Sequence, residues 1–337
     1  TGGFAFVVLE GVGVLLKLDA ASYGVVGSVS VGPNPRHVSI AHDGATVYVS
    51  RFVTPPLPGE NTASVQSATG GGEVVVVGAA SLAVNRTIVL HHSDKPDFEN
   101  QGSGVPNYLG AATISPDGTQ AWVPSKQDNI RRGVLRNGAQ LNFQNTVRAI
   151  SSRINLGSQA EDYAARLDHD NSGVASAVAF DPQGVYMFVA LETSREVAVV
   201  DAHGRWEMFR VPVGRAPQGL ALSADGLKLY VNNFMGRTVT VLNLSPLLVD
   251  GQSSVPVLAT LAAVGSERLS AQVLLGKQLF YDAADGRLAR DAYISCAACH
   301  NDGGQDGRVW DLTGFGEGLR NTIALRGRVG TAQGFLH

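Results

Sequence analysis

One local pattern occurs four times in the chain and constrains its fold more than any other feature. Each copy has a short run of alternating apolar residues, a turn that contains glycine, and a second apolar run. The copies span residues 38–49, 112–123, 178–189 and 220–231. Asp-Gly or Gln-Gly between two alternating runs is typical of a β-hairpin. The alternation buries one face of each strand against a neighbouring sheet.

Further strands are expected after these hairpins. Third strands are expected at 73–77, 196–200 and 238–242, and fourth strands at 86–90 and 206–211. Four strands in about forty residues are typical of a propeller blade. Before Pro35, strands at 4–9, 14–18 and 25–31 make up most of a blade that lacks its inner strand. The sequence therefore predicts a mainly β, multi-bladed β-propeller with about five visible blades, and seven in the full protein.

Three stretches rich in Pro, Gly or polar residues interrupt the repeats, at 54–72, 93–105 and 130–172. We expect them to be loops on a propeller face, outside the blade cores. After Pro246 the pattern changes, and apolar spacing predicts a helix over 269–280 that starts near Ser266 and Glu267. The expected domains are a propeller at 1–250, incomplete at its N-terminus, and a small α-helical cytochrome c-like domain at 255–337, truncated at its C-terminus.

The second domain contains the only two cysteines of the chain, in the run Cys296-Ala297-Ala298-Cys299-His300. Cys-x-x-Cys-His is the attachment signature of c-type haem. The two cysteines would form thioethers to the haem vinyl groups, and the histidine would be the proximal ligand of the iron. A redox pair would sit near a βαβ pattern, which is absent, and structural zinc needs four ligands. We predict one covalent haem c; a calcium ion is left open, since no pattern indicates one.

Composition excludes two classes of partner. The net charge of −3 provides no basic surface for nucleic acid. No run of 18 uncharged apolar residues predicts a membrane span. Covalent haem attachment implies an exported protein, so we expect a bacterial periplasmic or extracellular location. The incomplete first repeat indicates that the numbering starts inside a longer protein.

The repeats resemble the YVTN family of bacterial β-propeller repeats. The resemblance covers most of residues 1–245. It rests on the Asp-Gly turns, the Val47-Tyr48-Val49 strand, the Val-Ala-Val-Val-Asp run at 197–201 and Val-Gly-x-x-Pro at 213–217. These motifs specify the fold well and the function poorly.

The tail resembles the N-terminal haem domain of bacterial di-haem cytochrome c peroxidases and of the related methylamine-utilisation di-haem enzymes. The matching runs are Leu-Gly-Lys-Gln-Leu-Phe at 275–280, the haem motif, Asp-Gly at 306–307 and Arg-Asn-Thr at 320–322. The resemblance implies His300 as the proximal ligand. It also implies a second haem domain of the same protein, C-terminal to this one, which this chain lacks.

One departure from the resembling peroxidases concerns the distal face of the haem. Their ligating histidine in a Gly-His-Gly setting corresponds here to Phe315, which cannot bind iron. No methionine follows residue 235, and the only later histidine is His337. We expect His300 to be the sole axial ligand from residues 255–336. The distal face would be open to carbon monoxide or cyanide, unless His337, a propeller residue or sequence outside the chain fills it.

Other residues carry two interpretations each. Arg320 would pair with a haem propionate or remain a solvated arginine. His91, His92 and His169 invite a metal site, but isolated surface histidines are the more common case. Asp306 would act as an acid or base in peroxide chemistry or, as we favour, form a turn with Gly307. Trp310 would pack on the haem edge or in an ordinary core.

The leading functional hypothesis is an exported c-type cytochrome that exchanges electrons with a protein donor or acceptor. It would be part of a propeller fusion to a di-haem peroxidase-like protein. Whether the full-length protein is a peroxidase-like oxidoreductase stays open, and without a second haem we expect poor turnover of peroxide. The alternative is a propeller binding module for a protein or small molecule, with a structural or sensory haem. A third hypothesis is an oxidase or dehydrogenase whose substrate lies between propeller and haem.

Overall fold

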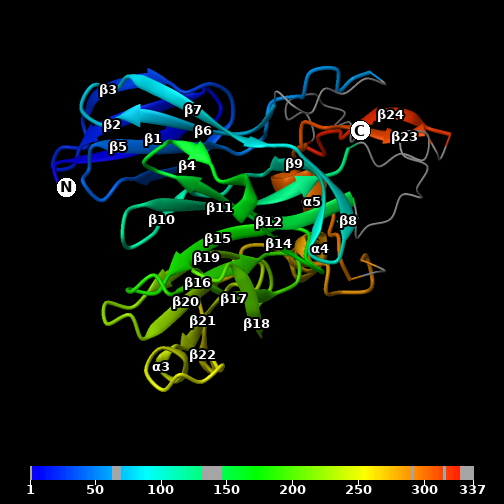
Figure 1. Ribbon diagram of the computed structural model, residues 1–337. Coiled ribbons are helices and arrows are strands. Elements are labelled where there is room, and N and C mark those ends of the chain that lie inside the picture. Colours follow the sequence, from blue (N-terminus) through cyan, green and yellow to red (C-terminus); the bar gives the residue numbers. More distant parts are fainter. Residues whose placement is uncertain (1, 63–69, 131–145, 290–291, 314–315, 327–337) are drawn as a thin grey trace.

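The computed structural model of the chain describes residues 2–62, 70–130, 146–289, 292–313 and 316–326. Figure 1 shows its sheets arranged one after another around a common centre, in a propeller-like arrangement. Four sheets have four or more strands, and the N-terminal sheet has three. The propeller predicted from the repeats is thus confirmed in its architecture. No helix among the described residues has the length and apolar character needed to cross a membrane.

The first two sheets are antiparallel meanders in chain order. The first contains β1 (Phe4–Leu9), β2 (Val14–Asp19) and β3 (Val25–Ser30). The second contains β4 (Pro35–Ile40), β5 (Thr46–Arg51), β6 (Gly71–Gly78) and β7 (Val84–His91). The N-terminal blade without an inner strand is therefore present as expected.

The third sheet is larger than the sequence predicts. Its seven strands are β8 (Ser93–Phe98), β9 (Gln101–Asn107), β10 (Thr113–Ile114), β11 (Gln120–Asp128), β12 (Val147–Asn155), β13 (Ala160–Glu161) and β14 (Leu167–His169). A 3₁₀ turn, η2 (Tyr163–Ala165), precedes β14. The stretches 93–105 and 130–172 were predicted as loops outside the blade cores, which is wrong for these strands. These strands carry many polar side chains, but their backbones still pair. Lys126 on β11, for example, is the register partner of Asn107 on β9.

The last two sheets follow the predicted repeat closely. One contains β15 (Ala175–Phe180), β16 (Tyr186–Leu191), β17 (Glu196–Asp201) and β18 (Trp206–Pro212). The other contains β19 (Pro217–Leu222), β20 (Lys228–Asn233), β21 (Thr238–Asn243) and β22 (Val257–Ala262), with the short helix α3 (Ser245–Leu248) between its last two strands. Because β22 pairs with β21, the sheet region extends past residue 255, where the second domain was predicted to begin.

The repeated turns adopt the backbone that their glycines permit. The repeat glycines Gly44, Gly118, Gly184 and Gly226 have φ angles of +71°, +69°, +71° and +72°. Residues with a Cβ rarely adopt this left-handed conformation. The glycine of each hairpin is therefore required by the turn itself, as the sequence pattern indicates.

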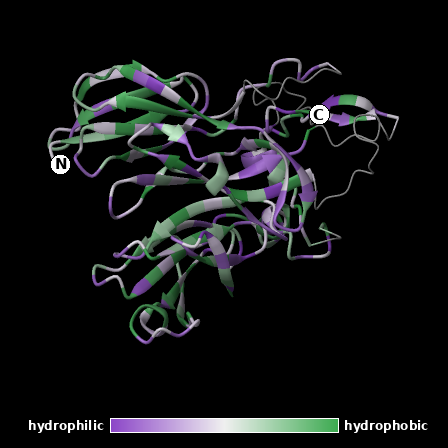
Figure 2. Ribbon diagram, viewed as in Figure 1, coloured by the Kyte–Doolittle hydropathy of each residue, from purple (hydrophilic) through white to green (hydrophobic). Residues whose placement is uncertain are grey.

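Alternating side chains of one strand pack against different neighbouring sheets. Val74 and Val76 of β6 belong to a core shared with the third sheet, whereas Val75 and Val77 face the first. In β17, Val197 and Val199 pack toward the last sheet, and Ala198 and Val200 toward the third. Figure 2 shows hydrophobic residues along many strands of these sheets. The core is thus a series of layers between sheets, as the period-two pattern requires.

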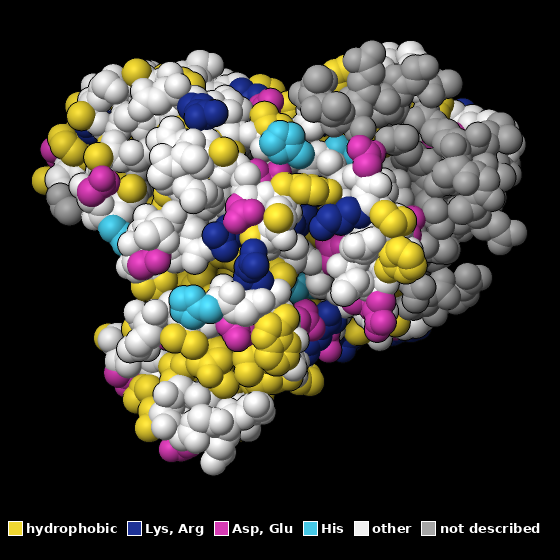
Figure 3. Space-filling model, viewed as in Figure 1, with side chains coloured by type: hydrophobic (Ala, Val, Ile, Leu, Met, Phe, Trp, Pro, Cys, Tyr) yellow, Lys and Arg dark blue, Asp and Glu magenta, His cyan; other side chains and the backbone are white. Residues whose placement is uncertain are grey.

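The first and last sheets carry many of the exposed apolar side chains. On β1, Val7 and Leu9 are exposed and alternate with the partly buried Phe6 and Val8. On β22, Leu258 and Leu261 are exposed. In the face shown in Figure 3, hydrophobic side chains gather in the lower half, over β15–β22. Each of these two sheets has only one face covered by a neighbouring sheet among the described residues.

The tail contains little helix in the part that the structure describes. Its elements are α4 (Ala271–Tyr281), α5 (Ala297–His300), the 3₁₀ turn η3 (Asn301–Gly303), β23 (Val309–Leu312) and β24 (Gly318–Asn321). Helix α4 begins two residues later than the predicted 269, since Ser270 caps it by accepting a hydrogen bond from Val273 N at 3.3 Å. The small helical cytochrome c-like domain predicted from the sequence is therefore only partly visible.

Candidate haem-binding site

The haem motif lies on one helical turn. The backbone of Cys296 is already helical, and His300 N donates a hydrogen bond to Cys296 O at 2.9 Å. Residues three apart lie on the same side of a helix, so the turn brings the side chains of Cys296 and Cys299 to one side. Cys296 is exposed and Cys299 is partly buried. The sequence motif therefore has the local backbone that a double attachment needs.

The imidazole of His300 is oriented by its own backbone loop. His300 Nδ1 lies 3.3 Å from the carbonyl oxygen of Gly304, which can only accept a hydrogen bond. This contact favours the tautomer with its proton on Nδ1, which leaves the lone pair of Nε2 for a metal. Metal-ligating histidines commonly use one ring nitrogen in this way, which fixes the tautomer and the ring orientation. The loop closes because Asp302 and Gly303 adopt φ angles of +53° and +70°.

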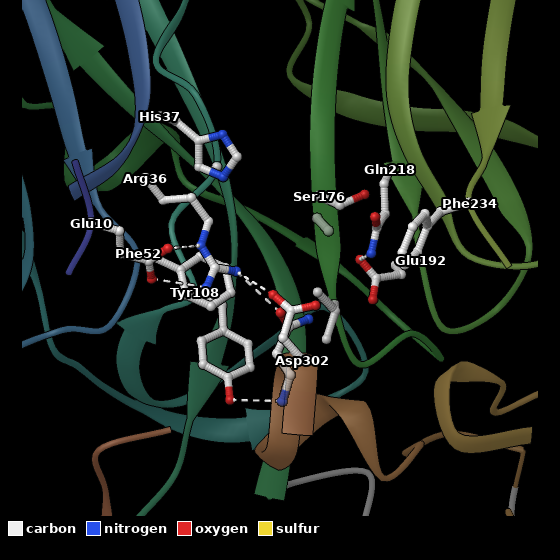
Figure 4. Close-up of a pocket in the computed structure, with 14 residues that line it drawn as sticks. Glu10, Arg36, His37, Phe52, Tyr108, Ser176, Glu192, Gln218, Phe234 and Asp302 are labelled. Carbon is white, nitrogen blue, oxygen red and sulfur yellow. Dashed lines mark hydrogen bonds and ion pairs between the residues drawn. The ribbon is translucent and has the colours of Figure 1, made fainter. Parts of the chain in front are cut away.

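Tyr108 of the propeller binds the backbone of the haem motif. Its hydroxyl donates to Cys299 O at 2.8 Å and accepts a hydrogen bond from Asn301 N at 3.3 Å. The ring stacks on Phe52, with 4.4 Å between ring centroids. Figure 4 shows Tyr108 reaching from the propeller toward the tail. Burial raises the pKa of Tyr108, so the hydroxyl stays protonated and able to donate.

A buried ion cluster lies beneath the same turn. The ammonium group of Lys126, on β11, lies 2.9 Å from Asp128 and 3.6 Å from Asp306 of the tail, and none of these side chains is exposed. Burial opposes the charge on Lys126, but the two carboxylates raise its pKa above the ordinary value. Burial raises the pKa of Asp128 to about 6. Asn107 bridges the cluster by donating to Asp128 Oδ2 and to Asp306 O, both at 2.8 Å.

These surroundings keep Cys299 neutral. Burial, with smaller contributions from the charges of Asp306 and Asp128, raises the pKa of the Cys299 thiol to about 12, although the nearby Lys126 lowers it. A thioether is also neutral, so the sulfur of Cys299 would remain uncharged next to this cluster after attachment.

Three ion pairs, at two separate places, hold the tail on the propeller. Arg308 and Glu60 form a pair at 3.0 Å with side chains 0% and 1% exposed, and Glu60 also accepts from Val309 N at 2.9 Å. At the other end, Asp282 accepts hydrogen bonds from Arg195 Nε at 2.9 Å and from Arg215 Nε at 3.0 Å. The turn that bears the haem motif is thus fixed between the second, third, fourth and last sheets. Nothing in the local sequence around these residues identifies them as partners.

The protein contacts of Asp306 and Trp310 agree with the structural interpretation of each residue. Asp306 is fully buried and accepts from Arg308 N at 2.9 Å, as expected of a turn residue. At Gly307, with φ +72°, a Cβ would lie 2.7 Å from Val53 Cγ1, so the turn needs glycine. Trp310 packs in a small core with Leu57, Val105 and Ile130. Both residues have structural roles among the described contacts.

The remaining predicted site residues are not brought to the motif by a described contact. Arg320, on β24, pairs with Glu317 at 3.0 Å and is 55% exposed, so its role at a propionate stays a prediction. Phe315 and His337 lie outside the described residues.

The histidines considered for metal binding have other partners. His169 contacts Ser151 Oγ at 2.9 Å and Glu207 at 3.0 Å, and His91 pairs with Glu161 at 3.0 Å. No group of three or more His, Cys, Asp or Glu side chains suited to a metal ion occurs in the described part of the chain. His92 is buried beside Asp94.

The tail matches a known family. Residues 270–332 match the sequence profile of the di-haem cytochrome c peroxidase family, which confirms the predicted resemblance and supports a haem protein in redox chemistry. No curated protein matches the chain significantly.

Two solved structures share the fold of the chain. Hydrazine synthase of Kuenenia stuttgartiensis is similar with a TM-score of 0.55 and 19% identity, over 72% of this chain and 68% of that one. A functionally unknown protein from Desulfotomaculum acetoxidans DSM 771 has a TM-score of 0.51 and 11% identity, over 78% and 67%. At these identities the likenesses establish the fold alone.

The residues at the motif fit a covalent haem. Cys296 is accessible, Cys299 is neutral, and His300 presents Nε2 as a free ligand atom. Apolar side chains are also exposed nearby: Leu325 N donates to Gly303 O at 2.8 Å, and Ile323 and Leu325 are 53% and 37% exposed. Exposed apolar groups of this kind suit a site that a large apolar ring covers.

Proposed function

We propose that this chain is a c-type cytochrome that exchanges electrons through one covalently bound haem. The observation that carries the proposal is the orientation of His300, whose Nδ1 is held by Gly304 O so that Nε2 is available to iron. The family match of the tail supports the same conclusion independently. Cys296 and Cys299 provide the two attachment points, and Arg320 is proposed to pair with a propionate.

The haem, when bound, supplies one-electron redox chemistry. The chain positions it. Gly304 orients the proximal imidazole, Tyr108 holds the peptide backbone of Cys299, and Asp306 with Lys126 fills the space behind the turn. Because these groups are hydrogen-bonded or paired in a buried setting, the motif is held rigidly while the oxidation state changes.

We also propose where the chain acts and with what. Covalent haem attachment favours export to the bacterial periplasm or the exterior. The electron donor or acceptor is proposed to be a protein, and a second haem domain of the same protein is proposed to complete a peroxidase-like unit. The YVTN-type assignment of the propeller repeats belongs to the same proposal. The distal ligand, with His337 as the candidate, remains a prediction.

The experiment that tests electron transfer is optical. The purified, haem-loaded chain should show a reduced-minus-oxidised difference spectrum of a c-type cytochrome, and repeated reduction and reoxidation should leave it unchanged. Peroxide should reoxidise it slowly and without sustained turnover. A haem that cannot be reduced, or that turns over peroxide rapidly in this chain alone, would contradict the proposal.

A second candidate function is a binding module. It is favoured by a cavity with both polar and apolar lining residues where the propeller sheets meet the tail, next to the haem motif. The two functions are compatible, since Cys296, Cys299 and His300 are not among the residues that line the cavity.

A further inference from the structure

A cavity of about 410 Å³ lies where the sheets of the propeller meet the tail. Residues of all five propeller sheets, or of loops that follow their strands, line the cavity. Asn301 and Asp302 of the tail complete its lining. Representative lining residues are Glu10, Arg36, Tyr108, Ser176, Gln218 and Asp302. Figure 4 shows these side chains converging from opposite walls. The cavity is large enough for a small organic molecule.

Glu192 is the most unusual side chain in this cavity. The residue follows β16 and is only 3% exposed, yet its carboxylate has one hydrogen-bond partner among the described residues, Gln218 Nε2 at 3.2 Å. A buried carboxylate can accept several more hydrogen bonds. Burial, with a smaller contribution from Asp302, raises the pKa of Glu192 to about 7, although Gln218 opposes the shift. Acceptor capacity of this buried carboxylate therefore remains unused in the cavity wall.

Arg36, the cationic side chain that lines the cavity, already has partners of its own. Arg36 pairs with Glu10 at 2.9 Å and with Asp302 at 3.3 Å, and its guanidinium lies 3.5 Å from the centroid of the Phe52 ring. Burial and the nearby Arg36 lower the pKa of His37 to about 4, so this imidazole is neutral at pH 7.

The charges of the lining favour a cationic occupant. Three carboxylates, those of Glu10, Glu192 and Asp302, outnumber the single guanidinium of Arg36. With Glu192 ionised, the described lining has a net negative charge. A cation with N–H donors would compensate that charge and supply the hydrogen bonds that Glu192 lacks.

Another part of the wall is apolar. Val174 and Ala175 line the cavity, and so does Phe234, whose ring packs edge-on against Tyr281 with 6.0 Å between centroids. In Figure 4, Phe234 stands beside Glu192 and Gln218. An alkyl group next to the cationic head would be removed from water against these side chains.

We propose that this cavity binds a small aliphatic primary amine as its alkylammonium ion, with the ammonium group on Glu192 and the alkyl chain against Val174 and Phe234. The proposal goes beyond electron transfer and does not depend on the haem. Failure of amine binding would leave the optical test of the haem unaffected, and the reverse also holds.

The test is calorimetric titration of the full chain with butylammonium chloride at pH 8. We expect saturable binding, and about tenfold to a hundredfold weaker binding by Glu192→Gln, because a charge-assisted hydrogen bond is lost. Glu196→Gln is the matched control, since Glu196 pairs with Arg210 outside the cavity, and it should bind as the unchanged protein does. Neutral 1-butanol should bind far more weakly, and so should tetramethylammonium, which has no N–H donor.

The dependence on pH is a second readout. A proton and the ammonium group compete for Glu192, so affinity should fall about tenfold between pH 8 and pH 6 in the unchanged protein but not in Glu192→Gln. The other polar or charged groups that interact with Glu192 are Gln218, Asp302, Arg36 and Tyr281. No binding of butylammonium, equal binding by folded Glu192→Gln, or equal binding of 1-butanol would overturn the proposal. Thermal unfolding of the variant verifies its fold.

Discussion

Replacing Arg308 by methionine should destabilise the folded chain by about 3–5 kcal/mol. Arg308 is 1% exposed and pairs with Glu60, which is equally buried. The substitution would leave the Glu60 carboxylate inside the protein without its cation, and a buried charge without a partner is costly. Glu60 also accepts from Leu57 N and Val309 N, so the loop and the tail should loosen together. Urea unfolding of the variant and the unchanged chain measures the difference.

The matched control for this prediction is Arg287→Met. Arg287 is 56% exposed and pairs with Asp285 at the surface, where water screens the pair, so its loss should leave the urea unfolding curve nearly unchanged. The double substitution Glu60→Met with Arg308→Met should recover part of the stability, because it removes both buried charges. A loss below about 1 kcal/mol for Arg308→Met would show that this pair does not hold the tail on the propeller.

Replacing His300 by glycine should have the largest effect on the haem itself. The thioethers to Cys296 and Cys299 would keep the haem attached, but the iron would lose its proximal imidazole. We expect a changed optical spectrum and a shift in midpoint potential of roughly a tenth of a volt or more, because the axial ligand is a main determinant of haem potential. Spectra and a redox titration measure both effects.

Imidazole added to the solution should restore much of the original spectrum of His300→Gly, because it can occupy the space of the missing side chain. His203→Gly provides the control, since His203 is exposed on a propeller turn far along the chain from the motif. Its spectrum should match that of the unchanged protein. An unaltered spectrum in His300→Gly would mean that another residue is the proximal ligand.

The sequence was sufficient for the parts of the fold that repeat. The four hairpins are specified locally, by alternating apolar residues and by glycines that adopt positive φ angles. The layered core follows from the same alternation, as the opposite packing of Val74 and Val75 shows. These features depend on neighbours along the chain, which a single sequence displays directly.

Strands that are polar, or whose pairing partner is distant in the sequence, could not be predicted from local patterns. The hairpin of β8 and β9 has few apolar residues. It belongs to the third sheet because the backbone of β9 pairs with that of β11. The strand β22 was missed because α3 and a loop separate it from β21. Pairing across such separations is decided by the tertiary fold.

The haem motif can be recognised in the sequence, but the propeller residues that hold it in place cannot. Cys296, Cys299 and His300 are adjacent, whereas Tyr108, Lys126 and Glu60 reach the tail from far along the chain. A lysine or glutamate in a polar stretch is usually solvated, and only the fold shows that these are buried. Long-range ion pairs of this kind leave no local pattern.

The most direct test of the central claim is the mass of the peptide that spans Cys296 to His300. The chain should be produced in a bacterial host that exports it and attaches c-type haem, then extracted with acidic acetone and digested. We predict that this peptide carries the mass of one haem, with fragment ions that place thioethers on both Cys296 and Cys299. An unmodified peptide from folded protein, with the haem released into the acetone, would contradict the account.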